Sequence, residues 1–289
     1  MKDLAGKTAF ITGGASGIGL AMARAFGREG MNVVISDVDK AALDVAAESL
    51  AELQIRAHPV ECDVGQRASV EAAARAAITA FGKVHVVCNN AGVAAGGPMN
   101  TVRDTDWSWV FDVNVMGVIY GMETFTPLMV SQGEGGHFVN TASIAGFLSP
   151  PGMEPYSASK HAVVAMSEGW AGQLSMVGLG VSVLCPYFVR TRIHESARAR
   201  QSRYGDAAPP DTSGTLGAAA QAVLAGIDPD VVGARVVEAI RANELYVFTH
   251  PQARPLVEAH FQRVLAGFDA ADASPALQSI KDLPLAGAG

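Results

Sequence analysis

The chain has 289 residues, of which 49% are hydrophobic and 17% are charged, a composition typical of a globular protein with a large core. Its formal net charge is −7 and its basic residues form no long run, which argues against a nucleic acid or an anionic membrane as a partner. Its three cysteines lack metal-ligand spacing and lie in or after apolar runs, which predicts buried, reduced thiols in a cytoplasmic protein.

Short apolar runs alternate with helical patterns as far as Pro186. We predict strands at 7–13, 32–37, 57–63, 84–92, 136–143 and 180–186, and helices at 17–30, 39–54, 67–82, 104–132 and 156–177. Apolar strands that alternate with helices predict a parallel sheet with helices on both faces. The expected fold class is therefore α/β, a single Rossmann-type, doubly wound sheet with a flap and a C-terminal helical extension.

The uncharged stretch from 169 to 189 is about long enough to cross a bilayer. Gly178, Gly180 and Pro186 interrupt it, and each of them disfavours a continuous helix. We interpret the stretch as a helix end, a tight turn and a buried strand, and we predict no membrane partner.

The sequence changes character after Pro186. Residues 205–227 are small, rich in glycine and proline, and uncharged after Asp211. Such a segment is typical of a mobile flap over a site, here about 187–228, or of a flexible insertion.

The C-terminal part begins with Asp228 and Pro229, which predict the N-cap and first residue of a helix that ends near Asn243. A strand at 245–250 and a last helix near 254–268 follow. We expect one domain from 1 to 268 and a flexible tail from 269 to 289.

The first predicted strand leads into "TGGASGIG" at residues 12–19. Gly13 permits a tight turn, Gly17 lets a pyrophosphate approach the backbone, and Gly19 lets the next helix pack closely on the strand. The N-terminus of that helix then offers N–H groups to phosphates. An ordinary glycine turn is the alternative, whereas a Walker-type loop is excluded because no Gly-Lys-Ser/Thr follows.

Asp37 stands at the end of the second predicted strand, eighteen residues after Gly19. A carboxylate at this place accepts hydrogen bonds from a ribose diol and repels a 2′-phosphate. Val38 and Asp39 follow it, so no basic residue comes directly after the strand. The pattern favours NAD over NADP, with a simple strand-end cap as the alternative.

Tyr156 and Lys160 in "YSASK" lie four residues apart and therefore share one face of a helix. A free tyrosine has a pKa of about 10, and a nearby ammonium group favours the phenolate and lowers that pKa. In a dinucleotide site the pair is a general base with its own electrostatic activator. Taken alone, a core tyrosine beside a surface lysine is the simpler interpretation.

Together these motifs resemble the short-chain dehydrogenase/reductase family. The resemblance covers about residues 5–195 and rests on TGxxxGxG at Thr12–Gly19, NNAG at Asn89–Gly92, Asn114, Ser143, Tyr156 and Lys160, with Ser143 thirteen residues before Tyr156. It implies that Tyr156 is the catalytic acid/base and that Ser143 orients and polarises the substrate oxygen. It also implies that Lys160 holds the nicotinamide ribose and lowers the pKa of Tyr156, and that Asn114 holds a water of the proton relay.

The resemblance further implies a set of contacts to NAD. The expected cofactor-binding residues are Thr12, Gly13, Ser16, Gly17, Ile18, Gly19, Asp37, Asp63, Val64, Asn90, Ala91, Gly92, Tyr156, Lys160, Pro186, Val189 and Thr191. Asp63 and Val64 would flank the adenine. No metal is expected, because His161, His194, His250 and His260 lack ligand spacing and are interpreted as surface or packing residues.

The segment "PYFVRT" at 186–191 departs from the family pattern, because Tyr187 replaces a usual glycine. We expect Tyr187 either to select the substrate or to be a tolerated packing change. The family layout places the substrate pocket at Ala94, Ala145, Phe147, Met153, Tyr187 and Phe188. These residues are mostly apolar, with only Arg190 and Arg192 near them, which favours a neutral, lipophilic alcohol or ketone.

The region from 178 to 268 also resembles a subgroup that oxidises bulky aromatic secondary alcohols, including Cα-dehydrogenases of lignin-derived aryl ethers. The resemblance as a whole implies an NAD-dependent oxidoreductase that interconverts a secondary alcohol and its ketone. It implies a homo-oligomer, a tetramer or dimer, formed through the helices at 104–132 and 156–177. The alternatives are a catalytically silent dinucleotide-binding sensor or scaffold, an NADP-preferring ketone reductase, and a sugar-nucleotide epimerase, which NNAG and the short chain disfavour.

Overall fold

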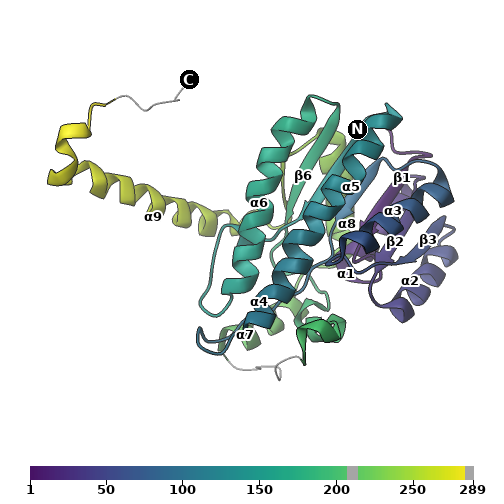
Figure 1. Ribbon diagram of the computed structural model, residues 1–289, viewed down its shortest axis with the longest axis horizontal. Coiled ribbons are helices and arrows are strands. Elements are labelled where there is room, and N and C mark those ends of the chain that lie inside the picture. The colour runs from purple at the N-terminus through teal and green to yellow at the C-terminus, as the bar shows by residue number, and fades with distance from the viewer. Residues whose placement is uncertain (207–213, 284–289) are drawn as a thin grey trace. The chain divides into compact units, whose positions relative to one another are not determined.

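The computed structural model describes residues 1–206 and 214–283, and the chain separates into two compact units, Met1–Thr249 and His250–Gly289. The first unit is built on a seven-stranded parallel sheet with the order β3-β2-β1-β4-β5-β6-β7 (Figure 1). Its strands are β1 (Thr8–Thr12), β2 (Asn32–Asp37), β3 (Ala57–Glu61), β4 (Val86–Asn89), β5 (Gly136–Thr141), β6 (Leu179–Cys185) and β7 (Tyr246–Phe248). The predicted fold class is confirmed.

Helices cover both faces of this sheet, as Figure 1 shows. One face carries α1 (Gly17–Arg28), α2 (Lys40–Glu52) and α8 (Pro229–Ala242), whose buried side chains join those of the strands in one apolar cluster. The other face carries α3 (Arg67–Phe81), α4 (Asp104–Phe111), α5 (Gly117–Gln132) and α6 (Glu154–Ser175). There the rings of Phe10 and Phe125 pack with their centroids 4.6 Å apart. Burial on both faces explains why the strands are continuously apolar.

The strand order reverses between β1 and β4, and such a reversal leaves a crevice at the carboxyl ends of the strands. The side chain of Thr12 ties the two strands together at this point. Its Oγ1 accepts hydrogen bonds from the backbone N–H groups of Asn90 at 2.9 Å and Ala91 at 3.0 Å. The glycine turn after β1 and the NNAG segment after β4 are therefore held side by side.

The helical pattern predicted over 104–132 is not one α-helix. A π-helix at Asp112–Met116 separates α4 from α5. The π-helix spans only five residues, and the apolar residues around it are too dense for a shift of one residue in the periodicity to stand out. Such insertions occur often at functional sites.

The predicted flap contains more regular structure than its composition indicates. It holds two 3₁₀ helices, η3 (Ile193–Ala199) and η4 (Ser202–Tyr204), and the helix α7 (Gly214–Leu224). Helix α7 was not predicted: its alanines favour a helix, but its two glycines and its lack of charged residues hide the amphipathic pattern of a surface helix. Residues 207–213 of the flap lie outside the described residues.

The start of α8 agrees with the sequence prediction. The carboxylate of Asp228 accepts a hydrogen bond from the N–H of Asp230 at 2.9 Å, and Pro229 is the first helical residue. The helix ends at Asn243, which adopts a left-handed conformation with φ 54°.

The second unit contains η5 (Pro251–Ala253), α9 (Arg254–Asp272) and η6 (Pro275–Ile280). The division between the units follows Thr249, whereas the sequence placed a domain boundary at 268, and α9 continues past that point. Residues 284–289 of the predicted flexible tail lie outside the described residues. Within 1–206 and 214–283, no helix is long and apolar enough to span a membrane, and the 169–189 stretch forms the predicted helix end, turn and strand.

Candidate active site

A large cavity of about 1650 Å³ opens at the carboxyl edge of the sheet within the first unit. Residues that follow β1 to β6 line it, together with parts of α4, η3 and α7. The predicted residues that line it are Gly13, Ser16, Gly17, Ile18, Asp37, Asp63, Val64, Asn90, Ala91, Gly92, Ala94, Ser143, Ala145, Met153, Tyr156, Lys160, Pro186, Tyr187, Phe188, Val189 and Thr191. Residues far apart in the sequence are therefore gathered at one site.

The glycine turn has the tight geometry that a pyrophosphate site requires. Gly13 has φ +63°, a conformation that side chains disfavour, and a Cβ there would lie 2.9 Å from the Cα of Ala91. A Cβ on Gly19 would lie 2.1 Å from the carbonyl oxygen of Gly13, so this position accepts no side chain. The turn leads directly into the N-terminus of α1 at Gly17, where free N–H groups favour an anion. These residues fit the diphosphate of a dinucleotide.

Asp37 lies at one end of the cavity, where β2 ends. Its carboxylate accepts hydrogen bonds from the N–H groups of Ala15 at 3.3 Å and Asp39 at 3.2 Å. Burial raises the pKa of this carboxyl group, and these backbone hydrogen bonds offset part of the rise. The carboxylate is held next to the glycine turn, and this placement fits an acceptor for ribose hydroxyls.

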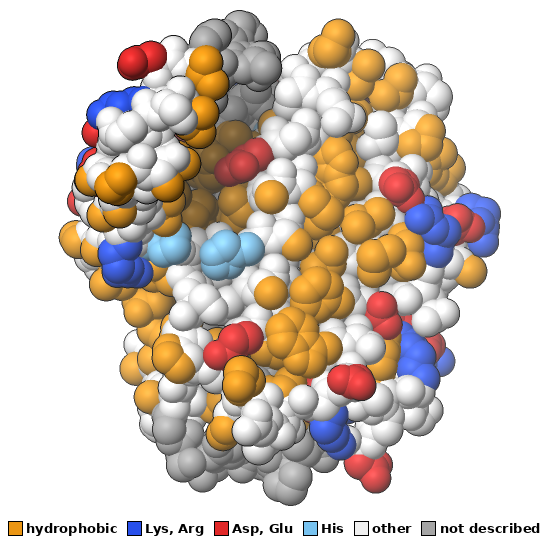
Figure 2. All heavy atoms as spheres, turned by 60° about the vertical axis from the view of Figure 1, so that its left-hand side comes forward, with side chains coloured by type: hydrophobic (Ala, Val, Ile, Leu, Met, Phe, Trp, Pro, Cys, Tyr) orange, Lys and Arg blue, Asp and Glu red, His pale blue; other side chains and the backbone are white. Residues whose placement is uncertain are grey.

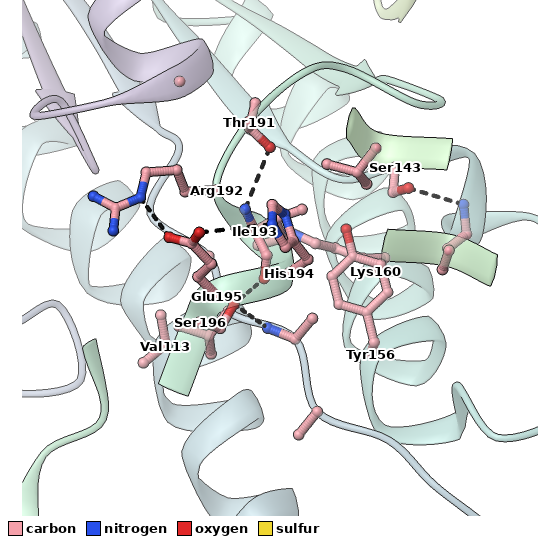
Figure 3. Close-up of a pocket in the computed structure, with 18 of the residues that line it drawn as sticks. Val113, Ser143, Tyr156, Lys160, Thr191, Arg192, Ile193, His194, Glu195 and Ser196 are labelled. Atoms are coloured by element: carbon pink, nitrogen blue, oxygen red, sulfur yellow. Dashed lines mark hydrogen bonds and ion pairs between the residues drawn. The ribbon is translucent and has the colours of Figure 1, made fainter. Parts of the chain in front are cut away.

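The first turns of α6 bring Tyr156 and Lys160 to the opposite part of the cavity, beside Ser143 from the loop after β5. In Figure 3 these three side chains lie together, and the segment from Thr191 to Ser196 faces them. The Ser143 hydroxyl accepts a hydrogen bond from the N–H of Ala145 at 3.1 Å and donates to the carbonyl of Pro186 at 3.3 Å. The orientation of this hydroxyl is thus fixed by the backbone on both sides.

The electrostatics of this group differ in one respect from the sequence prediction. Burial raises the pKa of Tyr156, and a hydrogen bond with Ser143 offsets part of that rise. The Lys160 ammonium lies 5.6 Å from the centroid of the Tyr156 ring and donates to the carbonyl of Thr141 at 2.8 Å. Ser143 therefore makes the direct contact that lowers the pKa of Tyr156, and a lowering by Lys160 stays a prediction.

Lys160 is itself strongly perturbed. Its side chain is only 3% exposed, and burial lowers its pKa to about 8. A buried ammonium group is costly unless it is compensated. Lys160 therefore gains or loses its proton at a pH near 8.

Four predicted residues lie behind the cavity wall rather than in it. Thr12 and Gly19 support the glycine turn, and Phe147 packs with its ring centroid 5.7 Å from that of Phe248. Asn114 is fully buried in the π-helix: its Oδ1 accepts from the N–H of Val93 at 2.8 Å, and its Nδ2 donates to the Val93 carbonyl and to Ser159. The Asn114 side chain thus braces the loop after β4, and its part in a water relay stays a prediction.

Several residues that line the cavity were not among the predicted site residues, although the sequence predicted a flap over 187–228 and placed Arg192 near the pocket. They are Asp106, Trp109 and Val113 near α4, the residues from His194 to Gln201, and most of α7. His194, interpreted from the sequence as a surface or packing residue, is among them (Figure 3). The one available signal was the density of arginines in "VRTRIHESARARQSR", which is unusual in a segment without helical periodicity. Within the described parts of the chain, no group of three His, Cys, Asp or Glu residues could hold a metal ion.

Comparison with known proteins agrees with this geometry. Residues 7–202 match the model of the family described as short chain dehydrogenase. The chain is 34% identical to a C alpha-dehydrogenase of a Sphingobium species, over 92% of this chain and 87% of that protein. It is 32% identical to a CLA biosynthesis dehydrogenase/reductase of Lactiplantibacillus plantarum, over 92% and 95% of the two chains.

A solved short chain dehydrogenase/reductase from Burkholderia phymatum, in complex with NAD, superposes with a TM-score of 0.88 at 41% identity and covers 92% of this chain and 97% of that one. The fold, the motifs and these relatives agree over most of the first unit. The chain therefore belongs to the short chain dehydrogenase family of oxidoreductases.

Proposed function

We propose that this protein is an NAD-dependent dehydrogenase that interconverts a neutral, bulky, aromatic secondary alcohol and its ketone. The observation that carries the proposal is the buried group of Ser143, Tyr156 and Lys160 in the same cavity as the glycine turn. A silent sensor or scaffold needs the glycine turn alone, so the acid/base group favours an enzyme.

Tyr156, Ser143 and Lys160 each have a separate role in the proposed reaction. When bound, NAD supplies the hydride acceptor for the carbinol carbon. In the oxidation direction the phenolate form of Tyr156 accepts the hydroxyl proton of the alcohol, and in the reduction direction the phenol form donates that proton to the carbonyl oxygen. Ser143 donates its hydroxyl hydrogen to the substrate oxygen in place of the Pro186 carbonyl. Lys160 holds the nicotinamide ribose and supplies positive charge beneath the Tyr156 ring.

A neutral substrate is supported by the charges around the cavity. The arginines that line it are already paired: Arg192 with Glu195 at 2.6 Å, Arg198 with Asp39 at 3.3 Å, and Arg200 with Asp106 at 2.9 Å. The sequence indicated only Arg192 of these three. Because each of these three arginines has its own carboxylate, none of the three is left over for an acidic substrate, and the Lys160 ammonium donates to the Thr141 carbonyl.

A bulky aromatic substrate is supported by the aromatic side chains of Tyr187 and Phe188. The cavity of about 1650 Å³ holds the dinucleotide as well as the substrate, so these apolar walls and not its total volume bear on the substrate class. The Tyr187 ring lies 4.2 Å from that of Phe188, and both line the cavity. The relative named C alpha-dehydrogenase favours the same class.

The proposal is tested by supplying NAD or NADP with a bulky aryl carbinol or with a small aliphatic secondary alcohol. We expect NADH to form fastest with the aryl carbinol. Tight NAD binding without turnover of any alcohol would instead favour the silent sensor. Faster ketone reduction with NADPH would favour the NADP-preferring reductase.

Replacing Asp37 by alanine should weaken NAD binding by about tenfold and leave NADP binding unchanged or stronger, because the variant loses an acceptor for the ribose diol and a charge that repels a 2′-phosphate. Thermal shift with NAD, NADP and neither measures both effects. A wild-type shift with NADP as large as that with NAD would contradict this role of Asp37.

Replacing Tyr187 by alanine should lower kcat/KM for a bulky aryl carbinol by about tenfold while changing that for a small alcohol little, because the variant loses apolar contact area that only the larger substrate uses. The ratio of the two kcat/KM values measures the effect. An equal loss for both alcohols would mean that Tyr187 supports the fold rather than selecting the substrate.

We further propose that the protein is a cytoplasmic homo-oligomer, a tetramer or dimer, formed through α4, α5 and α6. Large apolar side chains are exposed on and after these helices, among them Trp107, Val130 and Met176. Figure 2 shows one face of the molecule, on which apolar side chains lie among acidic and basic groups. The three cysteines are free and buried, as a reducing compartment favours. Light scattering at micromolar concentration tests the assembly, and a monomer would contradict it.

A further inference from the structure

The 3₁₀ segment from Ile193 to Tyr204, here called the strap, crosses the carboxyl edge of the sheet. It starts near the end of β6, on one side of the crevice. The Ser196 hydroxyl accepts from the N–H of Ala94, in the loop after β4, at 3.0 Å. Farther along, Arg198 reaches Asp39 after β2, and Arg203 reaches Asp63 after β3. The strap therefore runs from the Tyr156 side of the cavity to the Asp37 side.

The contact between Arg203 and Asp63 is a forked ion pair. Arg203 Nη1 lies 2.5 Å from one carboxylate oxygen of Asp63, and Nη2 lies 3.2 Å from the other. The guanidinium carbon also lies 4.6 Å from the centroid of the Tyr204 ring. Tyr204 is 5% exposed and donates its hydroxyl hydrogen to Asp112 at 2.8 Å. The far end of the strap is thus anchored by charge, stacking and a buried hydroxyl.

Arg198, the second arginine, lies near Asp37, at the end of the cavity where the ribose is expected. Arg198 Nη1 lies 3.3 Å from Asp39, whose other carboxylate oxygen caps α2 through the N–H of Ala42 at 3.0 Å. Arg198 is also close enough to Asp37 to act on its charge. Both arginines come from a segment more than 130 residues away from these aspartates in the chain.

We propose that Arg198 and Arg203 are cofactor-binding residues that hold the strap closed over the adenosine half of NAD, so that the cofactor exchanges only when both ion pairs open. The inference rests on the proposed use of NAD. Its physical basis is that Asp39 and Asp63, the partners of these arginines, follow the carboxyl ends of β2 and β3, where the adenosine is expected. Arg198 lines the cavity, and Arg203 pairs with Asp63, which lines it, so both ion pairs lie at the border of that site.

The test uses the full chain and measures binding, not turnover. Arg203→Ala, Arg198→Ala and the double variant are compared with wild type and with Arg190→Ala, a matched control. Arg190 pairs with Asp228 at 2.8 Å, is half exposed and does not line the cavity. The ligands are NAD, ADP-ribose, which contains the adenosine half, and nicotinamide mononucleotide, which lacks it. Calorimetry gives the dissociation constants, and stopped-flow fluorescence gives the dissociation rate of NAD.

Each single variant is expected to weaken NAD and ADP-ribose binding by about threefold to fivefold, because the loss of one partly exposed ion pair lowers the population of the closed strap that covers the adenosine half. The double variant is expected to release NAD about tenfold faster. Affinity for nicotinamide mononucleotide should stay at the wild-type value, as should all the affinities of Arg190→Ala. The differences should shrink at 1 M salt, where exposed charges are screened.

Unchanged NAD and ADP-ribose affinities in the double variant would overturn the role of the strap. Equal losses for all three ligands would overturn it as well, because they would indicate a general loss of structure. If wild-type protein binds no NAD at all, the proposed function itself fails, and the two failures are therefore distinguishable.

Discussion

Replacing Tyr156 by phenylalanine is expected to lower turnover by about 10²–10⁴-fold while leaving the dissociation constant of NAD within about twofold of the wild-type value. The substitution removes one oxygen atom and keeps the ring. The ring is what packs above the Lys160 ammonium, with 5.6 Å between nitrogen and ring centroid. The walls of the cavity and the glycine turn therefore stay as they are, and only the group that carries the proton is lost.

Stopped-flow or steady-state NADH formation measures the loss, and calorimetric titration with NAD provides the control. Ser143→Ala is the informative companion variant, because it removes the hydrogen bond that partly lowers the pKa of Tyr156. In Ser143→Ala the pH at which activity is half-maximal should move upwards, since burial alone then governs the phenol. Turnover retained in Tyr156→Phe would mean that another group moves the proton.

The sequence predicted the local structure at the carboxyl edge of the sheet, because interactions between residues close together in the chain determine it. Gly13 and Gly19 are needed where a backbone turns tightly, Asp228 and Pro229 begin a helix, and Tyr156 and Lys160 share a helical turn. Each of these features is decided by residues only a few positions apart. The parallel order of the strands follows in turn from the alternation of strands and helices.

The features that the sequence did not indicate are long-range or lack periodicity. Arg198 and Arg203 reach Asp39 and Asp63 from the far side of the domain, and no spacing in the chain marks those pairs. No basic residue comes directly after Asp37 in the chain, but Arg198 lies close enough to it in space to act on its charge. Likewise, the family resemblance implied a role for Asn114, but only its three hydrogen bonds reveal that it braces the loop.

Replacing Lys160 by methionine is expected to make the cofactor-free protein more stable and nearly inactive. Lowering the lysine pKa from 10.5 to about 8 corresponds to a cost of about 3 kcal/mol for burying the ammonium group, since one pKa unit equals about 1.4 kcal/mol. Methionine occupies a similar volume without a charge, although the hydrogen bond to Thr141 is lost at about 1 kcal/mol. The net gain of about 2 kcal/mol should raise the Tm by about 4–8 °C at pH 7.

The gain in stability of Lys160→Met over the wild type should decrease as the pH rises. Below pH 8 the lysine is protonated in both the folded and the unfolded protein, so its full cost is present. Between pH 8 and 10.5 the folded protein releases this proton while the unfolded protein still holds it, so a rising pH stabilises the wild type. The difference in Tm between Lys160→Met and wild type should therefore shrink over this window. The other titratable groups contribute equally to the stability of the variant and of the wild type, so their contributions cancel in the Tm difference.

Calorimetry at several pH values measures this difference, with Lys40→Met, an exposed lysine, as the matched control. A variant less stable than wild type at pH 7, or a Tm difference that widens as the pH rises, would contradict the burial cost. Greater stability together with a loss of activity would mean that the fold does not need this lysine. A group that destabilises the fold is expected to serve the function, and positive charge beneath Tyr156, at the proposed nicotinamide end of the cavity, is what this position can supply.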